Sequence, residues 1–143
     1  MVVLLVDAAN VVGARPDGWW RDRAGATSRL LRRLAPLAGR EVTAPGGGPV
    51  LCGEVVAVVE GTARAVARPG GVTLVRAPGS GDDALAACAA RLAEEGRDVL
   101  VVTADRGLRA RLPAGVAVAG PGWLYRVLDH QARPDGAVPD APA

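Results

Sequence analysis

Acidic residues stand at three points of the chain where a strand or loop ends and the next element begins. Asp7 and Asn10 follow one apolar run, Asp82 and Asp83 stand at the start of a predicted helix, and Asp105 follows a second apolar run. Carboxylates at the carboxyl ends of parallel strands face the crevice in which open α/β sheets bind ligands. Several carboxylates that converge there without a basic partner repel one another unless a hard cation lies between them. The pattern therefore predicts a Mg²⁺ or Mn²⁺ site and a metal-dependent hydrolase.

Length and composition are those of a single ordinary domain. The chain has 143 residues, of which 50% are hydrophobic, and this is enough for one core. No apolar run approaches the roughly 18 residues that span a bilayer, and Asp7 interrupts the first run too early for a signal-peptide core. We therefore expect a cytoplasmic protein with no membrane partner. A homodimer is compatible with the sequence.

The positive charge of the chain is concentrated in one segment. The sequence contains no lysine, and residues 15–40 hold seven arginines against two aspartates. A basic cluster beside an acidic site suits a phosphate-bearing substrate. For Arg29, Arg32 and Arg33, a solvated helix face is an equally good explanation.

Strand-like and helical patterns alternate along the chain. Five apolar runs predict buried strands, at residues 2–6, 55–59, 72–75, 99–102 and 116–118. The spacing of apolar residues predicts helices at 23–37, 84–93, 106–112 and 121–132. Strands that alternate with helices form right-handed crossovers and a mostly parallel sheet covered on both faces. We therefore predict an α/β fold, a three-layer α/β/α sandwich whose central five-stranded sheet has the order 3-2-1-4-5.

This strand order reverses direction between the first and fourth strands, so that Asp7 and Asp105 flank one crevice. Residues 44–49, with three consecutive glycines, are predicted to be a flexible connection. Residues 1–133 are expected to form one domain, followed by a flexible, proline-rich tail at 134–143.

Several chemistries that this fold class supports lack their motifs here. A Walker A loop needs a lysine, and the glycine-rich loop of a dinucleotide site does not follow the first strand. Phosphatases of the haloacid dehalogenase type and response-regulator receivers also use a lysine. The single histidine, His130, lies on the last predicted helix, so a serine or cysteine nucleophile has no evident histidine base.

The order and spacing of the acidic motifs resemble those of the PIN-like ribonucleases, and within them the NYN branch, over residues 1 to about 132. Asp7 matches the family's first acidic residue, at the end of a strand. Asp83-Ala-Leu matches its helix-opening pattern, and Thr103-Ala-Asp105 resembles its Thr-x-Asp motif after a later strand. The resemblance implies a PIN-like fold and hydrolysis of phosphodiester bonds, with single-stranded RNA as the expected substrate.

The resemblance also implies roles for individual residues. Asp7, Asp83 and Asp105 would bind one or two Mg²⁺ or Mn²⁺ ions, which activate water and stabilise the leaving 3′ oxygen, so that the product carries a 5′-phosphate. Asn10 fits the Asp-x-x-Asn opening common in the NYN branch. It is expected to hydrogen-bond the carboxylates or a metal-bound water.

The chain departs from the family pattern at Gly107, where many members carry another acidic residue. Glu60 and Asp82 are candidates for a further oxygen ligand. The departure at Gly107 favours one alternative function, a non-catalytic RNA-binding or regulatory module of the same fold. The other alternative is a phosphohydrolase acting on nucleotides, because the same metals polarise a pyrophosphate equally well.

Some of these residues also have an explanation within the fold. A side chain at a helix start is stabilised by the unpaired N–H groups there, so we expect Asp82 or Ser80 to cap the helix and Asp83 to face the site. Asp105 could also serve only as the cap of the short helix that follows it, but its convergence with Asp7 favours a role in the site. Thr103 is expected to hydrogen-bond a carboxylate or a metal-bound water.

Tryptophans and arginines stand together in the loop after the first strand. Trp19 and Trp20 lie between Arg15 and Arg21, a combination that suits stacking of unpaired bases with cations on the adjacent phosphates. One of the two tryptophans is expected to pack beneath the loop instead. Arg106, beside the predicted metal site, would hold a phosphate or pair with a neighbouring acid.

Overall fold

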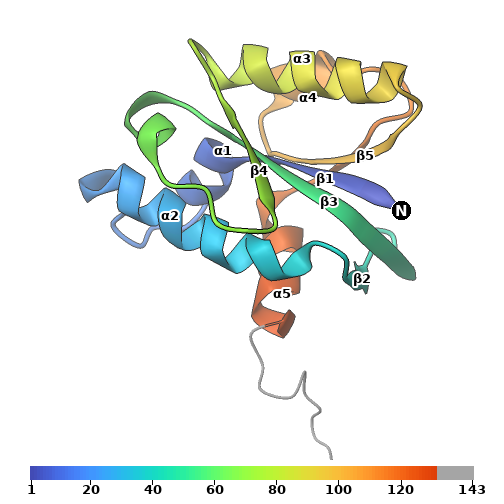
Figure 1. Ribbon diagram of the computed structural model, residues 1–143, viewed down its shortest axis with the longest axis horizontal. Coiled ribbons are helices and arrows are strands. Elements are labelled where there is room, and N and C mark those ends of the chain that lie inside the picture. Colours follow the sequence, from blue (N-terminus) through green and yellow to red (C-terminus); the bar gives the residue numbers. More distant parts are fainter. Residues whose placement is uncertain (132–143) are drawn as a thin grey trace, which may run out of the picture.

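A mostly parallel sheet of six strands forms the centre of the structure, a computed structural model that describes residues 1–131 (Figure 1). Within this part, five strands run parallel: β1 (Val2–Asp7), β3 (Pro49–Val59), β4 (Val72–Arg76), β5 (Asp98–Val102) and β6 (Ala117–Ala119). The sixth, β2 (Glu41–Thr43), pairs antiparallel with the start of β3. The α/β class and the mostly parallel sheet are as predicted from the sequence.

β1 lies between β3 and β5 in the sheet, while β4 pairs with β3 and β6 pairs with β5. The strand has no polar residue before Asp7, and all of its residues are buried. Such a run is typical of a strand covered on both faces. Asp7 lies opposite Val58 of β3, and Val6 lies opposite Val102 of β5. The residues that follow β1, β3 and β5 therefore meet at one edge of the sheet.

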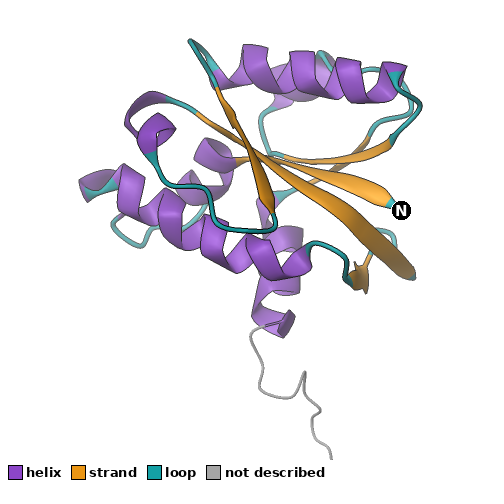
Figure 2. Cartoon of the chain, in the orientation of Figure 1, coloured by secondary structure: helices purple, strands orange, loops and turns teal. Residues whose placement is uncertain are grey.

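Helices lie on both sides of the sheet (Figures 1 and 2). One side carries α1 (Ala8–Gly13), α2 (Arg23–Leu34) and α5 (Pro121–Gln131), and the other carries α3 (Gly81–Glu94) and α4 (Arg106–Ala110). Successive side chains of β1 point to opposite faces, so Leu4 and Val6 belong to the first core and Val3 and Leu5 to the second. Short 3-10 turns stand at η1 (Trp19–Arg21), η2 (Ala35–Leu37) and η3 (Gly61–Ala65).

The sheet has six strands rather than the predicted five, because β2 was not predicted; α1 was not predicted either, and β3 begins at Pro49 rather than at 55. Two further differences have identifiable reasons. The predicted helix 23–37 ends as an α-helix at Leu34 and finishes in η2, because Pro36 has no N–H to continue the ladder. The predicted flexible connection 44–49 is a tight turn between β2 and β3. Gly47 and Gly48 have φ of 91° and 77°, and the Ala44 N–H donates to the carbonyl of residue 48 over 2.8 Å. Positive φ at both positions favours glycine.

The predicted tail, residues 134–143, and the predicted domain end at 133 lie outside the described residues. Within residues 1–131, no helix has the length and apolar character that a membrane crossing requires.

Candidate functional site

Asp7 is a buried carboxylate at the edge of the sheet where β1 ends. The residue is only 6% exposed, and its side chain caps α1 by accepting from the Asn10 N–H at 3.4 Å. The Thr103 hydroxyl, which follows β5, donates to the other carboxylate oxygen at 3.0 Å. A buried carboxylate needs such donors, because burial penalises its charged form. Thr103 and Asn10 thus hydrogen-bond the carboxylate from two different elements.

Further hydrogen bonds join the segment after β5 to α1. The Asn10 side-chain oxygen accepts from the Ala104 N–H at 2.8 Å, and the Thr103 hydroxyl accepts from the Asp105 N–H at 3.1 Å. Asp105 caps α4 by accepting from the Leu108 N–H at 2.9 Å. That bond uses one carboxylate oxygen of Asp105 and leaves the other without a hydrogen bond among residues 1–131. The structure thus brings Asp7, Asn10, Thr103 and Asp105 together.

Glu60 and Asp82 are the acidic residues whose charges act on Asp7. Burial is the main reason that the pKa of Asp7 is raised above its ordinary 3.8, and repulsion by Asp82 and Glu60 raises it further, while the bonds from Thr103 and Asn10 oppose the rise. Glu60 directly follows β3 and packs on the backbone of Gly81, where a Cβ atom would collide with its Oε1. Its carboxylate therefore lies at the first residue of α3.

Asp83 is exposed and paired with an arginine, whereas the sequence predicted that it faces the site. Its side chain is 71% exposed and forms an ion pair of 2.9 Å with Arg111. The Ser80 hydroxyl caps α3 by accepting from the N–H groups of Asp82 and Asp83 at 3.1 and 3.4 Å. Ser80 is thus a cap, as predicted, but Asp82 rather than Asp83 is the acid that acts on Asp7. Consecutive helical residues point about 100° apart, so only one of the two can face the site.

The acids at this edge are of the type that binds hard cations, but the structure does not arrange them as a metal-binding cluster. Within residues 1–131, no group of three or more Asp, Glu, His or Cys side chains is placed to hold a metal ion. In the same part of the chain, no arginine lies within ion-pair distance of Asp7, Glu60, Asp82 or Asp105. Carboxylates without a cationic neighbour are the ligands that Mg²⁺ and Mn²⁺ prefer. A metal-binding arrangement would require side chains to turn toward one another.

The two tryptophans of the loop differ in burial, as expected. Trp19 is half-buried and packs against the core, whereas Trp20 is 53% exposed and meets Trp19 edge to face at 5.9 Å between ring centroids. The Arg21 guanidinium lies 6.0 Å from the Trp20 ring. Arg15 lies over the Tyr125 ring at 3.7 Å, a contact that the sequence did not indicate.

Arg33 and Arg106 are two further arginines on the surface. Arg15 also pairs with Asp129 at 3.4 Å, and Arg33 pairs with the same carboxylate at 2.7 Å. Both contacts lower the pKa of the exposed Asp129, with the hydrogen bond from Arg33 as the largest cause. Arg106 is exposed at the start of α4.

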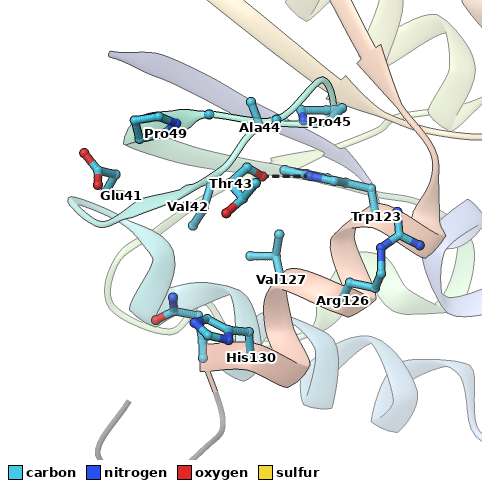
Figure 3. Close-up of a pocket in the computed structure, with 13 residues that line it drawn as sticks. Glu41, Val42, Thr43, Ala44, Pro45, Pro49, Trp123, Arg126, Val127 and His130 are labelled. Carbon is cyan, nitrogen blue, oxygen red and sulfur yellow. Dashed lines mark hydrogen bonds between the residues drawn. The ribbon is translucent and has the colours of Figure 1, made fainter. Parts of the chain in front are cut away.

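Cavities were not foreseen from the sequence. One of about 690 Å³ lies between the β2–β3 turn and α5 (Figure 3). The Trp123 indole closes one side of it by donating to the Thr43 carbonyl at 3.0 Å, and Arg126 and His130 line the side formed by α5. None of the predicted site residues lines it. A smaller cavity lies beside Glu60.

No protein-family model and no curated protein matches the sequence. Among solved structures, the chain is similar to Rae1 (YacP) from Bacillus subtilis, with a TM-score of 0.61 and 19% identity over 90% of this chain and 74% of that one. For the W164L mutant of Rae1 the TM-score is 0.64, with 21% identity over 90% and 76%. At these identities the likeness concerns the fold alone. It supports a PIN-like, NYN-type fold.

Proposed function

We propose that this chain is a metal-dependent ribonuclease that hydrolyses phosphodiester bonds of single-stranded RNA. The observation that carries the proposal is the state of Asp7: a buried carboxylate, held by Thr103 and Asn10 and repelled by Glu60 and Asp82. Retaining such a group costs stability, and perturbed carboxylates in a cluster are characteristic of functional sites. The fold likeness supports the proposal but does not select a chemistry by itself.

Four acids would hold Mg²⁺ or Mn²⁺: Asp7, Glu60, Asp82 and Asp105. A bound ion would supply an activated water and neutralise charge on the leaving oxygen. Asp83 would join this set only if its pair with Arg111 opens. The chain's own contribution is positional, since the Thr103 hydroxyl and the Asn10 N–H fix the direction of the Asp7 carboxylate.

The surroundings of the site suit an RNA strand. Trp20 offers an exposed ring on which an unpaired base can stack, with Arg21 next to it. Arg106, which is exposed at the start of α4, and Arg15, which pairs with Asp129, would provide cations for backbone phosphates. In the proposal these residues bind the RNA strand. The end of the sheet that carries Asp7, Glu60, Asp82 and Asp105, named the acidic edge, cleaves it.

A cleavage assay tests the proposal directly. End-labelled single-stranded RNA is incubated with the protein and Mn²⁺ or Mg²⁺, with and without EDTA, and the product ends are examined for a 5′-phosphate. Cleavage should require the metal and disappear in Asp7→Asn. Asp98→Asn is the matched control, because Asp98 is an exposed acid at the opposite end of β5. Metal-independent cleavage, or cleavage that survives in Asp7→Asn, would overturn the proposal.

A non-catalytic RNA-binding module is the second candidate, favoured by the Asp83–Arg111 ion pair and by the lack of a preassembled metal cluster within residues 1–131. It predicts RNA binding without cleavage and no heat on Mn²⁺ titration. Nucleoside triphosphates added to the same assay test the phosphohydrolase alternative, which predicts turnover of nucleotides but not of RNA.

A further inference from the structure

A cavity of about 240 Å³ opens beside Glu60, between α1, α2 and η3, and we name it the α1–α2 cavity. Ala8 and Ala9, the two residues that follow Asp7, form part of its wall, and Glu60 forms another part. The cavity therefore lies next to the acidic edge, on the side of the sheet covered by α1 and α2. Any group that enters it is held beside the proposed centre of cleavage.

The walls of the α1–α2 cavity are largely apolar and include one aromatic ring. Val12 and Val59 belong to the core beneath it, and the half-buried Trp19 closes one side. The Arg23 guanidinium also lines the cavity and lies 5.1 Å from the Trp19 ring. Indole and guanidinium planes are the surfaces on which proteins stack unpaired bases.

Thr27 brings a hydroxyl group to the wall of the α1–α2 cavity. It lies in the middle of α2, is only 3% exposed, and lines the α1–α2 cavity. With the Glu60 carboxylate, it gives the cavity one group that both donates and accepts and one that only accepts.

We propose that the α1–α2 cavity binds a single unpaired base of the RNA next to the bond to be cleaved, an inference that rests on the proposed function. The volume lies below the roughly 300–1,000 Å³ of sites for drug-sized ligands, which suits one base rather than a whole nucleotide. A phosphate is disfavoured inside because Glu60 lines the wall and Asp7 lies next to it. A neutral ring with polar edges matches the apolar walls, the hydroxyl and the carboxylate.

Arginines beside the α1–α2 cavity would bind the phosphates of the adjoining nucleotides. Val12 also lines a second hollow of about 170 Å³, together with Arg15, Arg29, Arg33 and Asp17. Arg15 and Arg33 share the ion-pair partner Asp129, and Arg29 has no ion-pair partner among residues 1–131. A strand whose base fills the α1–α2 cavity would place its backbone along these arginines. The base selects the position, and the arginines supply affinity that does not depend on sequence.

The inference is tested by NMR titration of ¹⁵N-labelled protein with the four free nucleosides, without metal. The indole N–H signals of Trp19, Trp20 and Trp123 report on the α1–α2 cavity, the exposed loop and the distant cavity respectively. We expect a saturable shift of the Trp19 signal with at least one nucleoside, while the Trp123 signal stays unchanged. Absence of the Trp19 shift, or an equal shift at Trp123, would overturn the inference.

Ala9→Leu and Thr27→Val sharpen the test, and Ala87→Leu is the control. Ala9 is exposed at the wall, so Ala9→Leu should fill the entrance and weaken nucleoside binding about tenfold, the effect of losing one stacked base. Ala87→Leu adds the same atoms to an exposed position of α3 and should change nothing. Thr27→Val should alter the ranking of the four nucleosides. Equal binding by Ala9→Leu and the parent protein would contradict the inference.

Cleavage assays on the same variants separate this inference from the proposed function. If the parent protein cleaves RNA and Ala9→Leu cleaves it with unchanged sequence preference, the base site is wrong while the ribonuclease proposal stands. If nucleosides shift the Trp19 signal but neither the parent protein nor any variant cleaves RNA, the base site stands and the ribonuclease proposal fails.

Discussion

The Thr103 hydroxyl donates a hydrogen bond of 3.0 Å to the Asp7 carboxylate, although 96 residues separate the two in sequence. The same hydroxyl accepts from the Asp105 N–H, so one buried oxygen links the ends of β1 and β5. Each of the two bonds fixes an acid of the proposed site.

Thr103→Val should therefore lower both stability and activity. The substitution keeps the shape but removes a hydrogen bond to a buried charged group, which costs about 1–3 kcal/mol. Urea unfolding measures the loss of stability, and carboxyl NMR should show that the pKa of Asp7 rises. Thr103→Ser keeps the hydroxyl and should recover most of both properties. A Val variant as stable as the parent would contradict the role assigned to this bond.

Asp7→Asn should make the protein more stable at neutral pH while abolishing cleavage. Folding raises the pKa of Asp7 above its ordinary 3.8, chiefly by burial, so the folded state binds the proton more tightly than the unfolded state. Its favourable contribution is thus complete below pH 3.8 and is lost as the pH rises through the raised value.

Urea midpoints of Asp7→Asn and the parent protein check this sign. The advantage of the Asn variant should be largest near pH 7 and should shrink as the pH falls toward 3.8. Asp98→Asn, at an exposed site, should show no such trend. A less stable Asn variant at pH 7 would mean that the hydrogen bonds to Asp7 outweigh its burial.

The class of fold could be predicted because local patterns determine it. The apolar run of β1 indicates a strand buried on both faces, and the cap at Ser80 with the apolar stripe of α3 indicates a helix on one face of the sheet. The short β2 escaped prediction, since three residues give too little pattern. The turn at 44–48, the pairing with β3, the buried Val42 and the hydrogen bond from Trp123 to the Thr43 carbonyl stabilise it.

The arrangement of the site depends on geometry that spacing does not contain. The sequence places Asp82 and Asp83 equally well at a helix start, and the partner that separates them, Arg111, lies 28 residues further along the chain. The cavity beside Glu60 likewise arises from side chains of α1, η1, α2 and η3. Strand ends indicate where acids gather, whereas tertiary packing decides which of them face one another.

Gly81→Ala should displace Glu60 without unfolding the protein. The new Cβ atom would collide with the far end of the Glu60 side chain, which can move, while alanine is a better helix former than glycine. We expect stability within about 1 kcal/mol of the parent and weaker Mn²⁺ binding by calorimetry. Gly79→Ala is the control, because a Cβ atom there meets open space. Unchanged Mn²⁺ affinity in Gly81→Ala would remove Glu60 from the proposed ligand set.

The two loop tryptophans should differ in their effect on stability. Trp20→Ala should weaken binding of single-stranded RNA about tenfold and leave the unfolding free energy unchanged, because the ring is exposed. Trp19→Ala should lower that free energy by about 2 kcal/mol, because its ring packs against the core. Fluorescence anisotropy and urea unfolding measure the two effects. Equal losses of stability in the two variants would contradict the difference in packing between Trp19 and Trp20.

Asp82→Asn and Asp83→Asn give the sharpest comparison at the acidic edge. Asp83 is exposed and paired with Arg111, and a surface ion pair contributes at most about 1 kcal/mol, so Asp83→Asn should change stability and cleavage little. Asp82, whose charge acts on Asp7, should be needed for cleavage, and Asp82→Asn should slow it at least about tenfold. Single-turnover cleavage rates measure the difference, and Arg111→Gln should behave like Asp83→Asn. The reverse result, with Asp83→Asn inactive and Asp82→Asn active, would show that the Asp83–Arg111 pair opens when metal and RNA bind.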